Sequence, residues 1–264
     1  MATNVHNEGP RGSSGEPRLN QSDPTVCVFI PTYNAEQTLA NVINRIRKAD
    51  FARILRVFVI DDGSSDATAR CAFDLAKLNP KIELFSFSEN RGYGAAVRTG
   101  IELCKSIDPD FCVCLHADGQ YPPESIGSFI NFMAKNSVDI LQGSRHKGGT
   151  ALAGNMPLYK YFFGKWLVRL ENLVFGLRMT DYHSGFLFYS RRAVSTIPFQ
   201  RFSASFDFDL EVIASARARN LNIQELAIPT HYGNEKSHLN PVTYGLRVLG
   251  VLVRYAIGAY GPKT

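Results

Sequence analysis

The sequence predicts an α/β protein in which a mostly parallel β-sheet is flanked by helices. Short apolar runs rich in β-forming residues alternate along the chain with segments whose apolar residues recur at helical spacing. This alternation is typical of βαβ units, whose strands form a parallel sheet. A chain of 264 residues has room for one large α/β domain or two small ones.

The first half of the chain supplies the expected sheet. Its strands are residues 26–30, 54–60, 82–87, 111–115 and 139–142. Helical segments separate them, at residues 39–46, 69–76, from Gly94 to about Lys105, and 126–133. Pro122 and Pro123 stop the fourth strand and open the helix that follows it.

The second half is expected to carry two amphipathic helices. Residues 157–178 place apolar side chains on one helical stripe and basic side chains beside it (Phe162, Trp166, Leu170, Leu173, Val174; Lys160, Lys165, Arg169, Arg178). Residues 244–260 are apolar, with Arg247 and Arg254 seven apart on one face. A basic amphipathic helix suits a membrane interface, and the alternative is a helix packed on the domain or on a partner subunit.

The composition indicates where the chain divides into segments and which class of protein it belongs to. Residues 1–24 are rich in Gly, Pro, Ser and Asn, which predicts a disordered tail before a domain at 25–240 and a C-terminal amphipathic helix at 241–264. A net charge of +5 does not imply nucleic-acid binding. Five cysteines without a C-x-x-C pair, and no apolar leader or spanning segment, favour a cytoplasmic location. Peripheral contact with the cytoplasmic membrane face is expected if the amphipathic helices lie on it.

Polar residues follow all five expected strands. They are Thr32, Tyr33 and Asn34, then Asp61 and Asp62, then Asn90 and Arg91, then Asp118 and Gln120, and finally Arg145. A turn or a helix cap explains any one of these groups. Ligands of parallel sheets bind beyond the carboxyl ends of the strands, so five polar ends at one edge predict a ligand site.

Asp118 and Gln120 are the candidate metal ligands. Side chains two apart on an extended chain point the same way, which would aim a carboxylate and an amide oxygen at the same crevice. Hard oxygen donors suit Mg²⁺ or Mn²⁺ that also carries substrate phosphates. The alternative is a helix N-terminus with ordinary turn residues.

Taken in order, several short motifs resemble glycosyltransferase family 2, whose nucleotide-sugar-binding fold, called GT-A, is Rossmann-like. The motifs are Ile30-Pro31-Thr32-Tyr33-Asn34, residues 59–66 around Asp61-Asp62-Gly63-Ser64, Asn90-Arg91-Gly92-Tyr93-Gly94, residues 117–124 around Asp118-Gly119-Gln120, Gly143-Ser144-Arg145 and Ser184-Gly185-Phe186. Among the branches of the family, the chain is most similar to the dolichol- or polyprenyl-phosphate sugar synthases.

The resemblance implies roles for individual residues. Pro31, Tyr33 and Asp61 or Asp62 would hold the base and ribose of a UDP- or GDP-linked sugar. Asp118 and Gln120 would bind the metal on the diphosphate, and Arg145 would meet donor or acceptor phosphate. Further substrate contacts are expected from residues in or beside the motifs: Asn90, Gly92, His116, Ser184 and Lys236.

Three positions depart from the family pattern. His116 stands where the lipid-phosphate synthases carry the first Asp of an Asp-x-Asp run, so it contacts the nucleotide, alters the metal set or forms a pocket wall. Ala35 replaces a common Glu. The late basic segment lacks its Arg, although Lys236 and two histidines keep positive charge there. The missing Arg concerns the binding of a lipid-phosphate acceptor more than the transfer of a sugar.

The family implies inverting transfer by one in-line displacement. A lipid-phosphate acceptor such as polyprenyl or dolichyl phosphate is already anionic, whereas a hydroxyl acceptor needs a general base. Asp207 and Asp209 are the candidate bases, with Asp181 as a third, although acids near a helix start also favour its dipole. The alternative function is a catalytically silent nucleotide-sugar-binding or scaffold protein of the same fold.

Overall fold

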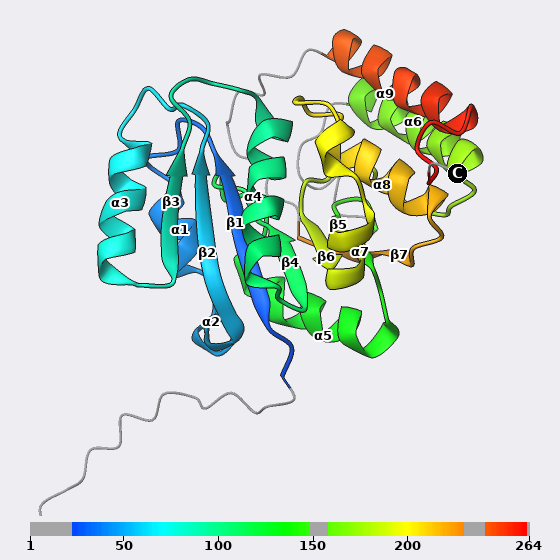
Figure 1. Cartoon of the computed structure of the whole chain (residues 1–264). Helices are drawn as coiled ribbons and strands as arrows, with labels where there is room; N and C mark the ends of the chain where they lie inside the picture. Colours follow the sequence, from blue (N-terminus) through cyan, green and yellow to red (C-terminus); the bar gives the residue numbers. More distant parts are fainter. Residues whose placement is uncertain (1–22, 148–157, 230–240, 263–264) are drawn as a thin grey trace, which may run out of the picture.

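The computed structural model describes residues 23–147, 158–229 and 241–262 (Figure 1). Nearly all of the predicted tail at residues 1–24 lies outside these ranges, and so does Lys236 with the basic segment around it. The side chains of Lys160 and Phe162 are also outside the described set.

A mixed sheet forms the centre of the molecule and has seven strands in the described part of the chain. The strands are β1 (Val26–Thr32), β2 (Ile54–Asp61), β3 (Ile82–Ser86), β4 (Phe111–Cys114), β5 (Ile140–Ser144), β6 (Leu187–Ser190) and β7 (Ile223–Ala227). Their order is β3-β2-β1-β4-β6-β5-β7. Only β6 runs antiparallel to its neighbours, β4 and β5, among these strands. The prediction of a mostly parallel sheet flanked by helices is confirmed.

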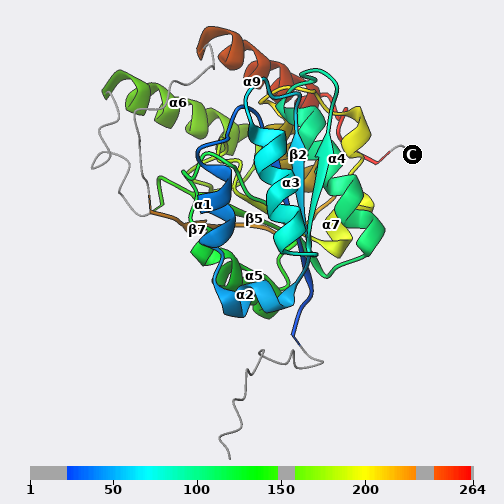
Figure 2. The ribbon, with the colours of Figure 1, turned by 90° about the vertical axis from the view of Figure 1, so that its left-hand side faces the viewer.

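Helices cover both faces of the sheet. They are α1 (Leu39–Asn44), α2 (Lys48–Arg53), α3 (Thr68–Leu78), α4 (Tyr93–Ile107), α5 (Ile126–Asn136), α6 (Leu158–Phe175), α7 (Arg191–Thr196), α8 (Phe208–Ala218) and α9 (Pro241–Ala256). Side chains of α1, α3 and α5 share one core, and those of α4, α6, α7, α8 and α9 share the other. Figures 1 and 2 show α6 and α9 side by side at one end of the molecule, where Phe175 and Tyr255 meet edge to face at 4.8 Å.

Alternation along the strands divides the two cores. Val26, Val28 and Ile30 of β1 face the core that contains α1, whereas Cys27 and Phe29 face the core that contains α4. This is the period of two that places successive strand side chains on opposite faces of a sheet. Cys112 and Cys114 are buried in the same core as Cys27, as their spacing predicted.

The fourth strand ends earlier than predicted. β4 stops at Cys114, and Asp118 lies in a turn in which Gly119 has a φ of +75°. The extended-chain argument for Asp118 and Gln120 was therefore wrong, because a turn separates the two residues. The Asp118 Oδ1 atom instead accepts a hydrogen bond from the backbone N–H of Gln120, at 3.0 Å. The predicted helix start holds, since the 3₁₀ turn Pro123–Ser125 leads directly into α5.

Candidate functional site

A pocket of about 510 Å³ lies beyond the carboxyl ends of β1 and β2. It is lined by Pro31, Thr32, Tyr33, Asp62, Asn90, Gly92, Tyr93, Ala96, Ser203, Ala204, Ser205, Phe206 and Arg247. Five of the predicted substrate-binding residues are in this set: Pro31, Tyr33, Asp62, Asn90 and Gly92. The volume is within the usual range for pockets that bind small molecules. Five parts of the chain that are distant in sequence therefore share one cavity.

Aromatic rings form much of the pocket wall. The rings of Tyr93 and Phe206 stack with their centroids 5.5 Å apart and an interplanar angle of 15°. Tyr33, on the loop after β1, is half exposed and available to a planar ligand. An aromatic ring can pack against the face of a nucleobase.

The two acids after β2 have different surroundings. Asp62 lines the pocket and accepts the backbone N–H groups of Arg91 and Gly92 at 2.7 and 3.0 Å. Burial raises the pKa of the Asp62 carboxyl although both bonds favour its ionised form. Asp61 is buried, accepts the backbone N–H of Ser64 at 3.1 Å and does not line the pocket. Of the two, Asp62 is the one in position to contact a ligand there.

Gly92 brings the loop after β3 against the loop before α8. Its φ is +94°, and a Cβ atom at this position would collide with the carbonyl oxygen of Ala204. The glycine is therefore needed both for the left-handed backbone and for the close approach of the two loops. Both loops line the pocket, so this contact joins two parts of its wall.

A set of hydrogen-bonded polar groups, partly or fully buried, extends from the pocket through Tyr93. The Tyr93 hydroxyl donates to the Asp209 Oδ2 atom at 2.8 Å and lies 3.1 Å from the His116 Nε2 atom. Burial raises the pKa of Asp209 to about 7 and lowers the pKa of His116, which favours the neutral forms of both groups. The other Asp209 oxygen, Oδ1, is buried and has no hydrogen-bond partner among the residues that the structure describes.

His116 is packed on several sides. Its ring meets those of Tyr93 and Tyr121 edge to face, at centroid distances of 5.4 and 4.9 Å. A Cβ atom on Gly185 would collide with the imidazole, so the motif Ser184-Gly185-Phe186 closes the third side. His116 thus contacts the pocket residue Tyr93 but is not itself among the residues that line the pocket.

The Asp118 turn offers oxygen donors to a cation. Asp118 and Gln120 are both partly exposed, and neither lines the pocket described above. Within the described residues, no group of three His, Cys, Asp or Glu side chains is arranged to hold a metal ion. One carboxylate with an amide nevertheless fits Mg²⁺ or Mn²⁺, because such ions retain waters and take further oxygens from substrate phosphates.

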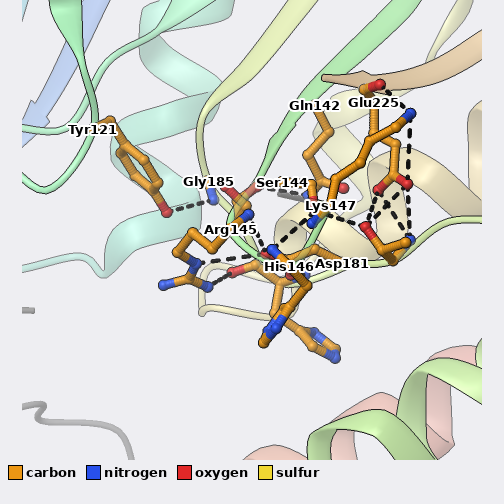
Figure 3. A network of polar contacts seen from close by, with 12 residues as sticks. Tyr121, Gln142, Ser144, Arg145, His146, Lys147, Asp181, Gly185 and Glu225 are labelled. Atoms are coloured by element: carbon orange, nitrogen blue, oxygen red, sulfur yellow. Dashed lines mark hydrogen bonds and ion pairs between the residues drawn. The ribbon is translucent and has the colours of Figure 1, made fainter. Parts of the chain in front are cut away.

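Arg145 lies at the end of β5 in a network of polar contacts (Figure 3). Its Nε atom is 3.5 Å from the Asp181 Oδ2 atom, and its Nη2 atom donates to the His183 carbonyl at 3.2 Å. Burial would raise the pKa of Asp181, but Arg145 and His183 hold it below its usual value. Figure 3 shows the guanidinium extending away from Lys147, toward the side on which Tyr121 lies. A carboxylate-supported guanidinium is suited to a phosphate.

His183 joins this network to both amphipathic helices. Its Nδ1 atom is 2.8 Å from the Tyr244 hydroxyl of α9, and its Nε2 atom is 3.3 Å from the Glu171 Oε1 atom of α6. Glu171 is fully buried, which raises the pKa of its carboxyl. Burial would lower the pKa of His183, but Glu171 raises it above its usual value. The pair with Glu171 connects α6, and the hydrogen bond with Tyr244 connects α9, to the loop that supports Arg145.

Comparison with known proteins identifies the family. Residues 27–197 match the sequence model of Glycosyl transferase family 2. The chain belongs to this family. The resemblance inferred from the ordered motifs is confirmed, and the chain is a glycosyltransferase enzyme.

Several relatives of this glycosyltransferase are named for lipid-phosphate chemistry. The UDP-N-acetylglucosamine–dolichyl-phosphate N-acetylglucosaminyltransferase of Methanococcus voltae is 28% identical over 80% of this chain and 87% of its own length. The polyprenol monophosphomannose synthase of Mycolicibacterium smegmatis is 24% identical over 94% of this chain and 87% of its own.

Solved structures support the GT-A fold of the glycosyltransferase. A glucosyl-3-phosphoglycerate synthase from Mycobacterium tuberculosis, in complex with Mn²⁺, UDP and phosphoglyceric acid, superposes with a TM-score of 0.63. It is 17% identical, and the match covers 91% of this chain and 80% of that one. The same enzyme in complex with Mg²⁺ and UDP also gives 0.63. The fold prediction is confirmed.

Two other predicted site residues of the glycosyltransferase, Ser184 and Asp207, mainly contact other residues of the chain. Ser184 is fully buried, and its carbonyl accepts the side-chain amide of Gln142 at 2.7 Å. Asp207, before α8, accepts the Ser203 hydroxyl at 2.8 Å and pairs with Arg247 at 3.3 Å. Their roles in substrate binding and catalysis stay predictions.

Some pocket residues were not singled out as site residues from the sequence. Tyr93 belongs to a quoted motif, so it could have been found there. Phe206 precedes the predicted bases, and Arg247 was noted only for its spacing from Arg254 on an amphipathic helix. No local pattern marks these two, because the fold alone brings α9 and the loop before α8 to the carboxyl ends of β1 and β2.

Proposed function

We propose that this glycosyltransferase moves a sugar from a nucleoside-diphosphate sugar to a polyprenyl-type lipid phosphate, with inversion at the anomeric carbon and with a divalent cation. The observation that carries the proposal is the pocket at the carboxyl ends of β1 and β2, which unites Pro31, Tyr33, Asp62 and Asn90. The names of two relatives, which include dolichyl phosphate and polyprenol, support the acceptor class.

The donor base and ribose would occupy this pocket. Tyr33 offers a ring face to the base, and the Asn90 side chain offers both a donor and an acceptor. Asp62 would accept from a ribose hydroxyl while its bonds to the loop after β3 keep the carboxylate in place. The choice between uracil and guanine would follow from how these groups meet the base edge.

Asp118 and Gln120 would hold a Mg²⁺ or Mn²⁺ ion together with the donor diphosphate. When bound, the ion would offset the negative charge that develops on the leaving diphosphate. The acceptor phosphate oxygen forms its bond to the anomeric carbon as the bond to the diphosphate breaks, and the nucleoside diphosphate leaves with the electron pair. Arg145 would orient the acceptor phosphate for this displacement. An anionic acceptor needs little help from a base.

A membrane surface would present the lipid acceptor to α6 and α9. Exposed apolar side chains lie on both helices and just after α9: Trp166, Leu173, Leu246, Leu249, Val253 and Ile257. Lys165 and Arg169 are exposed on α6, as expected of a helix at the headgroup level. Within the described ranges, none of the helices combines the length and the apolar character required to cross a bilayer.

Product analysis tests the proposal directly. The full chain is incubated with Mn²⁺, polyprenyl phosphate and a panel of UDP- and GDP-linked sugars, and the lipid products are identified by mass spectrometry. We expect one donor to yield a glycosylated polyprenyl phosphate with inverted linkage. Absence of both lipid product and nucleoside diphosphate release with every donor would instead support the catalytically silent alternative.

A further inference from the structure

We propose that Arg247 of α9 binds the diphosphate of the donor, so that the C-terminal amphipathic helix completes the donor pocket. α9 lies outside the segment that matches the family, which ends at residue 197. The inference rests on the proposed function, since it assumes that the pocket beyond β1 and β2 receives a nucleoside diphosphate.

Charge balance in the pocket is the first argument. Among the described residues that line the pocket, Arg247 is the only Lys, Arg or His, and Asp62 is an acid. A donor diphosphate entering this partly desolvated space would bring negative charge close to Asp62. Burying such charge is costly, and Arg247 is the side chain of this lining that can offset it, in addition to the divalent ion proposed at the Asp118 turn.

The position of α9 is the second argument. Val248 and Val251 are fully buried and fix the helix on the domain, whereas the Arg247 side chain is half exposed toward the pocket. Its backbone is therefore anchored although its charged end remains accessible. This arrangement places a guanidinium at the mouth of the pocket without requiring movement of the helix.

The pairing of Arg247 leaves it able to bind a second anion. Its Nη1 atom is 3.3 Å from the Asp207 Oδ1 atom, and Asp207 also accepts the Ser203 hydroxyl. A guanidinium has five N–H donors in a planar fork, so one carboxylate contact does not exhaust it. Because Asp207 is buried, the guanidinium would keep this contact and use its remaining N–H groups for a phosphate. Asp207 would hold the side chain over the pocket.

Arg254 provides a matched control on the same helix. It lies seven residues from Arg247, pairs with the buried Glu211 at 3.0 Å and is similarly exposed. It does not line the donor pocket. Replacing either arginine by glutamine removes one charge from α9 and one ion pair to a buried acid, so the two variants differ in whether the lost guanidinium faces the pocket.

The test is titration calorimetry of the full chain with UDP, GDP, uridine and guanosine in the presence of Mn²⁺. We expect Arg247→Gln to weaken binding of the preferred nucleoside diphosphate by about tenfold or more, and to change binding of the matching nucleoside by less than about twofold. Arg254→Gln should bind both ligands like the wild type. Arg247→Lys, which keeps the charge but loses the planar fork, should fall between the wild type and Arg247→Gln.

Thermal melts accompany the titrations, and Arg247→Lys carries the test if Arg247→Gln does not fold. Equal losses for nucleoside and nucleoside diphosphate, unchanged binding by Arg247→Gln and Arg247→Lys, or an equal loss in Arg254→Gln would each overturn the assignment. A wild-type chain that binds neither UDP nor GDP would refute the proposed function itself. The two failures are thus distinguishable.

Discussion

At the scale of single residues, the Asp118 carboxylate is where a change of one atom should be most informative. Asp118→Asn keeps the shape of the side chain, removes the charge beside the proposed cation and retains an acceptor for the Gln120 N–H. We expect affinity for the preferred nucleoside diphosphate in Mn²⁺ to fall at least about tenfold, or 1.4 kcal/mol, by titration calorimetry. Glu124→Gln serves as the control, because it removes the charge of another acid on the same segment as Asp118. In the wild type Glu124 pairs with Arg45. Unchanged, metal-independent binding by Asp118→Asn would remove Asp118 from the metal site.

Asp209 predicts a pH dependence of stability. Burial raises its pKa to about 7 from the ordinary aspartate pKa of about 4, so between these values the folded chain holds a proton that the unfolded chain has released. The stabilisation is therefore fully present below about pH 4 and is lost as the pH rises through about 7. Relative to Asp209→Asn, which stays neutral, the wild type should lose up to about 1.4 kcal/mol of unfolding free energy per pH unit within this window. Urea unfolding at several pH values measures the difference, and parallel profiles for the two proteins would contradict it.

The site residues differ in how far the sequence could reveal them. Pro31, Asp62 and Asn90 follow neighbouring parallel strands, and the geometry of such a sheet necessarily brings them to one edge. Arg247 reaches the same pocket from a helix whose position depends on the packing of Val248 and Val251 against the rest of the domain. Local spacing carries no information about that packing, so the sequence could not assign Arg247 to the site.

At the scale of elements, the strands of the sheet also differ in how far the sequence could reveal them. Each of the first five strands is marked by a local apolar run and a turn, and all five were predicted to within a few residues. β6 is a four-residue strand inserted antiparallel between β4 and β5, which places β5 away from β4. The apolar run of β6 is visible in the sequence, but its partners and direction depend on non-local pairing. Similarly, Glu171 lies within the predicted amphipathic segment 157–178, yet it is buried against His183.

The exposed apolar faces of α6 and α9 predict attachment to lipid. Changing Leu246 and Val253 of α9 together to Gln removes two exposed apolar side chains without touching the buried Val248 and Val251. We expect this variant to sediment with anionic liposomes less than the wild type, since apolar burial at the interface is lost. Leu78→Gln on α3, which removes an even more exposed leucine from a different helix, is the control. Equal sedimentation of all three proteins would argue against a membrane role for α9.

At the scale of the whole molecule, the fold brings the proposed membrane surface close to the proposed reaction site. The carboxyl ends of β1, β2 and β3 point toward the end of the molecule at which α9 lies (Figure 1). His183 contacts α6 through Glu171 and α9 through Tyr244, and its carbonyl accepts from Arg145. A lipid phosphate whose tail remains in the bilayer beneath these helices would therefore have its headgroup near Arg145.

Arg145→Lys tests this arrangement. The substitution keeps the charge that offsets buried Asp181 but loses the planar fork that can hold a phosphate through two parallel bonds. We expect transfer to polyprenyl phosphate to fall by roughly tenfold while donor affinity stays near that of the wild type, because Arg145 does not line the donor pocket. Radiometric transfer assays and donor titrations measure the two quantities separately, and Arg192→Lys, an exposed arginine paired with Asp139, controls for the loss of a guanidinium elsewhere.

Liposome attachment of the wild type should weaken at high salt, since salt screens the attraction between basic side chains and anionic headgroups. A protein that ignores liposomes and transfers sugar only to a soluble hydroxyl acceptor would refute the lipid-phosphate proposal. Such an acceptor requires a base, and Asp207 and Asp209 would then be the residues to test.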